Sequence, residues 1–123
     1  MPEIDATGLR SLAVQSVAVI RAGQAASGAY LASPAFPVYR YSWFRDGAFI
    51  ADAMSRAGDR DSAERFFGWC SRVLVERAGT IEALLARSRA GETIPPSDFM
   101  HSRYTVDGDD SPEMIVDWYA RHG

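Results

Sequence analysis

Lysine is missing from this sequence, in which all 13 basic residues are arginine. The 16 acidic residues outnumber them and give a formal net charge of −3. Such a chain has no basic field to gather nucleic acid or an anionic membrane surface, so we expect neither as a partner. Long apolar runs are absent too, and none approaches the roughly 20 residues that a membrane-spanning helix needs. With 47% hydrophobic and 24% charged residues, the composition is that of a globular protein.

Cysteine and histidine are scarce, which excludes several kinds of site. Cys70 is the only cysteine, so it has no disulfide partner and no neighbour at zinc-ligand spacing. We interpret it as a small buried hydrophobic residue. His101 and His122 also lack metal-spaced or nucleophilic partners, and we expect both at the surface. The sequence therefore gives no support for a disulfide framework, a metal centre, a cofactor or a hydrolytic triad.

The N-terminal residues do not have the pattern of a secretion signal. Residues 1–5 include Glu3 and Asp5, where a signal peptide would carry basic residues. We therefore expect a cytoplasmic protein.

One dense mixture of aromatic and charged residues is present, running from Tyr39 to Ala48 with the sequence YRYSWFRDGA. A sugar ring offers apolar C–H faces to aromatic side chains, and its hydroxyl groups both donate and accept hydrogen bonds. Arg45 beside Asp46 supplies a donor and an acceptor together. Because good helix formers follow Asp46, these groups are expected at a helix start, where backbone N–H groups are also free. The tract is suited to a polyhydroxylated ligand.

Three segments, in order, carry a more specific pattern. The tract continues through a helix to Met54, and a Gly turn then leads into the segment from Gly58 to Trp69. Together these resemble the start of the catalytic domain of glycoside hydrolase family 15, the glucoamylase, glucodextranase and trehalase-like family. Upstream, the segment 28–34 is similar to one that precedes the tract in bacterial members. Downstream, the segment 102–108 resembles the family's Arg-Tyr-x-x-Asp-Gly turn.

The resemblance implies an all-α fold in which helical hairpins close an (α/α)6 toroid. We interpret residues 1–123 as a single region, the N-terminal portion of such a domain, with residues 110–123 not matched to the family. Family members hydrolyse a glycosidic bond with inversion, using two carboxyl groups roughly 6.5–9.5 Å apart. In the family both groups come from later parts of the ring. The resemblance therefore assigns no catalytic residue to this chain, and we expect the isolated chain to be inactive.

The resemblance also implies substrate contacts, residue by residue. Arg45 and Asp46 match the pair that holds hydroxyl groups of the sugar at the non-reducing end. Tyr39 matches an aromatic residue close to the reacting sugar, and Trp43 matches one that walls the same subsite. We predict that these four converge on one concave end of the helices. Arg103 either lines the site or braces its own turn, and both interpretations stay open.

Each assignment has a purely structural alternative. Arg45 beside Asp46 also fits an exposed charge next to a helix start. Tyr39, Tyr41 and Trp43 alternate along the chain, so one face of an extended strand could bury them in a core. We favour ligand contact for Tyr39 and Trp43, and the core for Tyr41.

Apolar periodicity predicts a series of helices. The first runs from Thr7 to Gly23 and should bury one face. A second is expected over 46–57, ending at a left-handed Gly58, and a third of about four turns follows a capping box at 61–64. Because their connection is short, the second and third helices should be antiparallel. The core side of the third is predicted to hold Ala63, Phe66, Phe67, Trp69, Cys70, Val73 and Leu74.

The remaining segments are predicted to be mainly loops. Residues 25–38 contain glycine and prolines, which favour a loop with a short strand near 29–31. Thr80 caps a further helical run, and Gly79 either kinks one long helix or separates two. The segment 103–106 should pair as a short strand before an Asp-Gly turn.

A last helix is predicted to begin after Ser111, which serves as the N-cap. Pro112 and Glu113 follow it in the first turn. As a piece of a ring, the chain should leave an apolar edge in water, including Leu12, Val17 or Trp118. The partners expected for that edge are the rest of the domain or a second copy of the chain.

We interpret the chain as part of an inverting glycosidase that binds an α-glucoside or oligosaccharide substrate. Within the family the bond stays open between α-1,4-glucan, α-1,6-glucan and trehalose. A non-catalytic carbohydrate-binding or regulatory domain is a second hypothesis. A third is an unrelated helical interaction module, for which an exposed apolar stripe and no sugar-suited cluster are expected.

Overall fold

The structure, a computed structural model, describes residues 5–33 and 35–111. Within this range the fold is all-α with one small β-ribbon, which confirms the predicted fold class, and no helix there is long and apolar enough to cross a membrane. The helix predicted after Ser111 lies outside the described residues, together with Trp118 and His122. In chain order the elements are α1 (Ala6–Gly23), η1 (Pro37–Tyr39), β1 (Ser42–Trp43), α2 (Phe44–Arg56), α3 (Arg60–Glu76), α4 (Ala78–Arg89), η2 (Pro96–Asp98) and β2 (Arg103–Tyr104).

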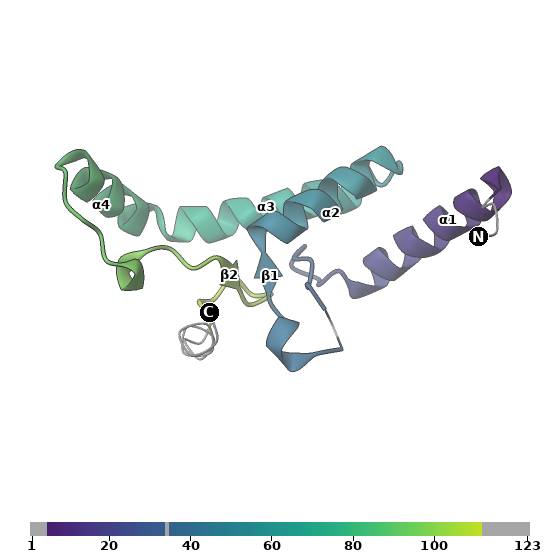
Figure 1. Cartoon of the computed structure of the whole chain (residues 1–123), viewed down its shortest axis with the longest axis horizontal. Helices are drawn as coiled ribbons and strands as arrows, with labels where there is room; N and C mark the ends of the chain where they lie inside the picture. Colours follow the sequence, from purple (N-terminus) through teal and green to yellow (C-terminus); the bar gives the residue numbers. More distant parts are fainter. Residues whose placement is uncertain (1–4, 34, 112–123) are drawn as a thin grey trace.

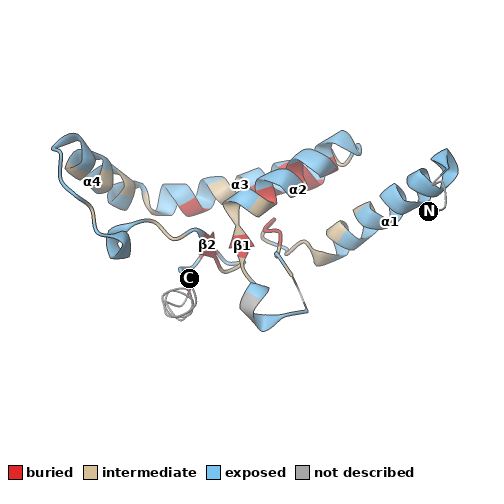
Figure 2. Ribbon diagram, in the orientation of Figure 1, coloured by how far each residue is buried: buried red, intermediate tan, exposed pale blue. Residues whose placement is uncertain are grey.

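Helices α2 and α3 lie side by side and antiparallel at the centre of the molecule, as predicted (Figure 1). Gly58 ends α2 with a positive φ of 93°, a conformation that suits glycine. Gly47 lets the two helices approach closely, because a Cβ atom there would lie 2.2 Å from Cζ of Phe66. The buried residues gather around this hairpin (Figure 2). They are Ala29, Tyr30, Ala51, Met54, Ala63, Phe66, Trp69, Val73 and Tyr104.

Both central helices begin differently from the prediction. Helix α2 starts at Phe44 rather than Asp46, because the extended residue Trp43 leads directly from β1 into the helix. Helix α3 has Asp59 as its N-cap, and the carboxylate of Asp59 accepts a hydrogen bond from the backbone N–H of Ser62 at 3.2 Å. This side-chain cap takes the place of the predicted capping box.

The buried face of α3 is narrower than its periodicity predicts. Phe67 and Leu74 are 54% and 41% exposed, so the core positions predicted for them are wrong. Trp69 is buried, as predicted, and its ring lies 5.8 Å from that of Phe66. Cys70 is half-buried and packs against the core. The face that is covered is the one turned toward α2 and the loop before η1, where Phe66 stacks on Tyr30. On the same side, the indole N–H of Trp69 donates to the carbonyl oxygen of Val106 in the β2 turn, residues 104–110.

Helix α1 joins the centre of the molecule near its C-terminal end, where Arg21 pairs with Asp59, the N-cap of α3. None of its described residues is buried, so the predicted buried face is wrong. Val17 and Ile20 are half-buried against the core, whereas Leu12 is exposed, as predicted for an open edge. In Figure 1 the rest of α1 runs away from the hairpin, and its side chains Leu9, Leu12, Val14 and Val19 are exposed.

The segment between α1 and η1 is a loop that lies against α3. An isolated bridge between Gln24 and Tyr30 stands in place of the strand predicted near 29–31. Gly28 has a φ of 100°, and a Cβ atom there would lie 2.2 Å from the carbonyl oxygen of Arg65. Only glycine therefore allows the loop to approach α3 so closely.

Helices α3 and α4 are separate, and the break falls at Arg77 rather than at Gly79. Thr80 consequently lies inside the first turn of α4 and is not its N-cap. No described residue of α4 is buried (Figure 2).

The β-ribbon lies below the middle of the hairpin (Figure 1). Its strands are antiparallel, with Ser42 opposite Tyr104 and Trp43 opposite Arg103. Strand β2 is shorter than predicted, and the turn that follows it has a left-handed Gly108 with a φ of 89°, as the Asp-Gly pattern indicated. The ribbon brings the tract at the start of α2 together with a segment about 60 residues away in the sequence.

Candidate functional site

Tyr39 stands at the end of the short helix η1, which begins at Pro37. The backbone N–H of Ser33 donates to the carbonyl oxygen of Tyr39 at 3.0 Å, so the preceding loop holds this residue in place. The Tyr39 side chain is exposed, and its ring lies 6.4 Å from that of Trp43 with the ring planes inclined by 43°. Two rings in this arrangement offer apolar faces to a ligand.

Trp43 forms the centre of an aromatic and cationic group. The ring of Tyr41 meets it edge-on, with the ring centroids 6.3 Å apart. The guanidinium carbon of Arg103 lies 4.7 Å from the centroid of Tyr41 and 5.5 Å from that of Trp43, which is within the range of cation–π attraction. Arg103 is only 7% exposed, so it approaches the rings from the inside of the protein.

Tyr41 does not have the position that its sequence pattern favours. It is half-buried and lies outside the hydrophobic core, in contact with Trp43 and Arg103. The core interpretation of Tyr41 is therefore wrong. The strand pairing of Trp43 with Arg103 places an arginine beside the tract, and the arginine draws the Tyr41 ring toward it.

Arg45 and Asp46 occupy the first turn of α2. Their side chains point toward each other, with 3.0 Å between Nε of Arg45 and Oδ1 of Asp46. The side chains are 78% and 38% exposed, respectively. A carboxylate in the first turn is favoured by the helix dipole, so the fold itself stabilises Asp46 where it stands. The bond uses one of the five N–H donors of the guanidinium group.

The predicted site residues thus form two groups near the start of α2. Tyr39, Trp43 and Arg103 are in contact through their side chains, and the Arg45–Asp46 pair begins two residues after Trp43 in the chain. Two hollows of the described surface, of about 180 and 370 Å³, lie elsewhere, around Arg77 and around Arg21. Tyr41 also belongs here, although its sequence pattern predicted a core position, and it lies in the same tract as Tyr39 and Trp43. We call Tyr39, Tyr41, Trp43, Arg45, Asp46 and Arg103 the ring-and-pair cluster.

Other groups with possible chemistry lie away from this cluster. Burial raises the pKa of the Cys70 thiol to about 11, which makes the thiol a poor nucleophile. His101 is half-buried, contrary to the surface position predicted for it, because its Nδ1 lies 3.1 Å from Oγ of Ser111. Among the described residues there is no group of three or more His, Cys, Asp and Glu side chains that could hold a metal ion.

Comparison with known proteins connects this geometry to a family. Residues 9–110 match the family model described as glycosyl hydrolases family 15. An isomaltose glucohydrolase from Kribbella flavida is 44% identical over 111 residues, which make up 89% of this chain and 29% of that protein. A wild-type glycosidase of known structure has a TM-score of 0.80 and 38% identity, and the match covers 98% of this chain and 38% of that one.

A glycosidase variant solved in complex with glucose has the same TM-score of 0.80 and 38% identity, again over 98% of this chain and 38% of that one. The chain therefore spans about a third of the length of these relatives. The agreement in sequence and structure extends over nearly the whole chain, and it includes the tract at the start of α2 and the β2 turn. This chain belongs to glycosyl hydrolases family 15, and its helices form part of the family's (α/α)6 toroid.

Proposed function

We propose that this chain supplies the glucosyl-binding part of a family 15 glycosidase that hydrolyses an α-glucosidic bond with inversion. The observation that carries the proposal is the ring-and-pair cluster, in which the exposed ring of Tyr39 lies close to the half-buried ring of Trp43, and a paired arginine and carboxylate follow in the same tract. Rings, donors and acceptors in one place are what a sugar requires, because each pyranose has apolar C–H faces and hydroxyl groups around its edge.

Each member of the cluster has a distinct task in this proposal. Tyr39 and Trp43 contact the C–H faces of the terminal glucosyl residue. Asp46 accepts hydrogen bonds from sugar hydroxyl groups, and Arg45 donates to them through N–H groups that do not bind Asp46. Arg103 orients the Trp43 ring from behind, which follows from its burial and its position over that ring. A pre-oriented ring binds at a lower cost in conformational entropy.

Isomaltose is the substrate that we propose for the whole enzyme. The curated relative that carries this name is 44% identical to the chain. Isomaltose contains the α-1,6 bond that is one of the family alternatives predicted from the sequence. The cluster recognises the glucosyl residue, and loops elsewhere in the domain recognise the leaving group.

The chemical step requires groups that we do not assign to this chain. Inverting hydrolysis needs one carboxylic acid to protonate the leaving oxygen and one carboxylate to activate water, on opposite sides of the bond. We propose that both come from the part of the domain beyond residues 1–123, and that this part covers the exposed apolar side chains of α1. The isolated chain then binds glucose without hydrolysing isomaltose, because each missing proton transfer is worth roughly a hundred- to ten-thousand-fold in rate.

A matched pair of variants on α2 tests the proposal. Asp46 pairs with Arg45 at 3.0 Å, and Asp52 pairs with Arg56 at 2.9 Å. Both carboxylates therefore lie on one helix in similar ion pairs, but only Asp46 belongs to the cluster. Glucose affinity is measured by NMR titration of the chain, with isomaltose hydrolysis assayed in parallel.

We expect Asp46→Asn to weaken glucose binding about tenfold or more, the loss typical of one hydrogen bond to a charged group. Asp52→Asn should bind glucose as the unmodified chain does. Equal effects of the two substitutions, or no glucose binding by the unmodified chain, would contradict the proposed subsite. Hydrolysis of isomaltose by the pure chain would show that the catalytic groups have been assigned to the wrong part of the domain.

A further inference from the structure

Arg77 lies at the break between α3 and α4, outside the ring-and-pair cluster. We propose that Arg77 is a positioning residue for the sugar site, because it holds the β2 turn on α3 and so fixes where β2 presents Arg103 to Trp43. The inference rests on the function proposed for that cluster. By β2 turn we mean residues 104–110.

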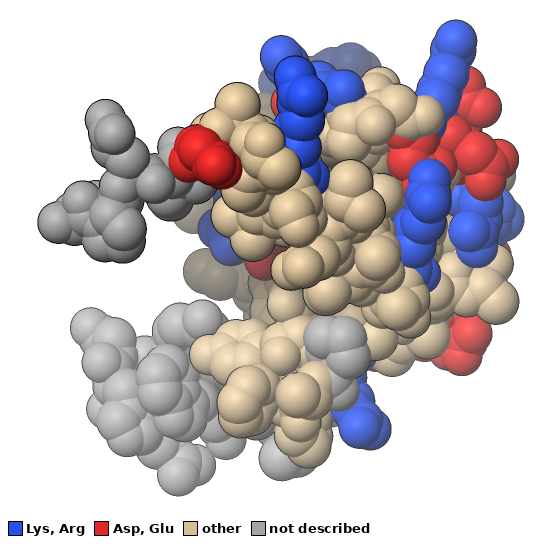
Figure 3. Space-filling model, turned by 90° about the vertical axis from the view of Figure 1, so that its right-hand side faces the viewer, with Lys and Arg blue, Asp and Glu red and all other residues tan. Residues whose placement is uncertain are grey.

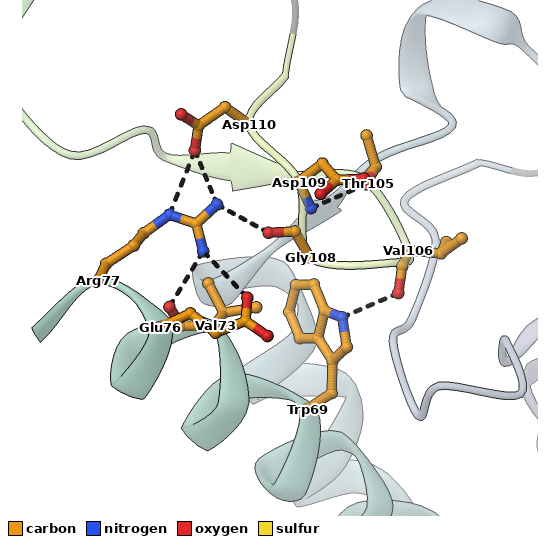
Figure 4. A network of polar contacts seen from close by, with 9 residues as sticks. All are labelled: Trp69, Val73, Glu76, Arg77, Thr105, Val106, Gly108, Asp109 and Asp110. Carbon is orange, nitrogen blue, oxygen red and sulfur yellow. Dashed lines mark hydrogen bonds and ion pairs between the residues drawn. The ribbon is translucent and has the colours of Figure 1, made fainter.

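One guanidinium group connects α3 to the turn (Figure 4). Its Nη1 donates to the carbonyl oxygen of Val73 at 3.0 Å, and its Nη2 donates to that of Gly108 at 2.7 Å. Nη2 and Nε both bind Oδ1 of Asp110, at 2.8 and 3.2 Å. The guanidinium carbon also lies 4.4 Å from the ring centroid of Tyr104. Since the Arg77 side chain is only 16% exposed, water screens these contacts less than those of a surface ion pair.

The β2 turn is closed by hydrogen bonds among its own residues. The backbone N–H of Thr105 donates to the carbonyl oxygen of Asp109 at 2.9 Å, and the N–H of Gly108 donates to that of Thr105, also at 2.9 Å. The N–H of Asp109 donates to Oγ1 of Thr105 at 3.0 Å (Figure 4). Tyr104 and Asp110 close the base of the turn as an isolated bridge. Anchoring Gly108 and Asp110 therefore anchors Tyr104 as well.

The position of Tyr104 sets the position of Arg103. Neighbouring residues of a strand point to opposite faces, and Tyr104 is fully buried beside Phe44 while Arg103 faces Tyr41 and Trp43. A slip of one residue in the register would turn Arg103 away from the rings.

The ribbon alone is too short to prevent such a slip. Each strand has two residues, and so short a ribbon is marginal in water without outside support. Support comes from α3 at two points: Arg77 at one end of the turn, and the indole N–H of Trp69, which donates to the carbonyl oxygen of Val106 at 2.9 Å. Of these two, Arg77 reaches Tyr104 directly.

Arg87 provides a matched control for the experiment. It lies in α4 and pairs with Glu92 at 2.8 Å and with Asp98 at 3.0 Å, so it too joins a helix to the segment that leads into β2. Neither of these partners belongs to the ribbon or the β2 turn. If arginine ion pairs only stabilise the fold in general, substitutions at Arg77 and Arg87 should have the same consequences for the site.

The test compares Arg77→Met, Arg77→Lys and Arg87→Met in the full chain, below their unfolding temperatures. Glucose is the probe, and the indole N–H signals of Trp43 and Trp69 are followed by NMR with and without it. We expect Arg77→Met to shift the Trp43 signal without glucose and to weaken glucose binding about fivefold. Arg77→Lys should restore little of the affinity, because an ammonium group cannot bridge Val73, Gly108 and Asp110 together. Arg87→Met should leave both readouts unchanged.

Failure of this inference and failure of the proposed function give different results. An unmodified chain that binds glucose, with a folded Arg77→Met variant that binds it equally well, overturns the role of Arg77 and leaves the proposed function standing. An unmodified chain that does not bind glucose contradicts the proposed function, and an unshifted Trp43 signal in the glucose-free variant overturns the positioning of Arg103. If Arg77→Met does not fold, Asp110→Asn weakens the same contact at an exposed partner and is expected to give smaller changes in the same direction.

Discussion

The centre and the two ends of this molecule differ in burial, although both contain apolar residues. Helices α2 and α3 hold every buried helical residue in the described range, whereas α1 and α4 hold none (Figure 2). Helix α1 is not polar, since several of its large apolar side chains are exposed. From the α1 side, uncharged residues form a broad area, while charged groups of both signs gather toward the upper right (Figure 3).

The contrast between α2 and α3 on one side and α1 and α4 on the other shows that apolar content alone does not decide which helices are packed. An apolar face becomes buried when another element of the chain lies opposite, and α2, α3, the β-ribbon and the loop before η1 do this for one another. The ends of the chain have no such partner within the described residues. The ring-and-pair cluster is attached to this packed centre through β1, α2 and β2.

Two adjacent phenylalanines of α3 test this contrast most strongly. Phe66 is 1% exposed and Phe67 is 54% exposed. Phe66→Ala should lower the free energy of unfolding by about 3–5 kcal/mol, the usual cost of removing a buried ring. Phe67→Ala should cost less than about 1 kcal/mol, because most of its ring stays in water. Urea unfolding measures both, and similar losses for the two variants would contradict the assignment of the buried face.

The ion pair between Arg21 of α1 and Asp59 is expected to contribute less to the free energy of unfolding than Phe66, and its contribution depends on pH. The hydrogen bond from Arg21 lowers the pKa of the Asp59 carboxyl group, more than burial raises it, and the N–H of Ser62 adds to the lowering. Since the folded pKa lies below the unfolded one, the carboxylate stabilises the folded state above the unfolded pKa. This contribution is lost as the pH falls through the folded pKa.

Asp59→Asn should therefore lower the urea midpoint at neutral pH and change it little in strong acid. The difference from the unmodified chain should narrow steadily as the pH is lowered. Asp52→Asn is the control, because Asp52 pairs only at the surface of α2. A difference that stays constant across this pH range would mean that the Asp59 carboxylate does not stabilise the fold through its charge.

The smallest effect on stability is expected on α1. Leu12 is exposed, so Leu12→Gln should change the free energy of unfolding by no more than about 0.5 kcal/mol. The same substitution should reduce self-association, since it removes apolar surface from the open edge. Light scattering at tens of micromolar measures this. A monodisperse, sharply unfolding monomer before any substitution would contradict the open edge and indicate that the ends need no partner.

Features fixed by neighbouring residues could be predicted from the sequence. Gly58 and Gly108 have the left-handed conformations that their turn patterns indicate. The pairing of α2 with α3 followed from a short connection, and the tract lies at a helix start as expected. In the cluster, the contact of Arg45 with Asp46 required only their adjacency.

Features fixed by distant residues could not be predicted. The apolar stripe of α3 is wide enough to include Phe67, and segments distant in sequence decide which side is covered. Tyr30 of the loop before η1 stacks on Phe66, and Val106, 37 residues after Trp69, accepts the hydrogen bond of its indole N–H. Local pattern places a helix break at glycine, but the break falls at Arg77, whose guanidinium reaches Gly108 across 31 residues. The sequence pattern predicts a core position for Tyr41, because it does not show that the strand register brings Arg103 beside the Tyr41 ring.

The proposed function requires that glucose binds at the packed centre, and a map of NMR chemical-shift changes on glucose addition tests this directly. We predict that the largest changes fall on the ring-and-pair cluster, with the Trp43 indole signal among them, and that α1 and α4 change little. Changes centred on α1 or α4, or no changes at millimolar glucose, would contradict the proposed binding site.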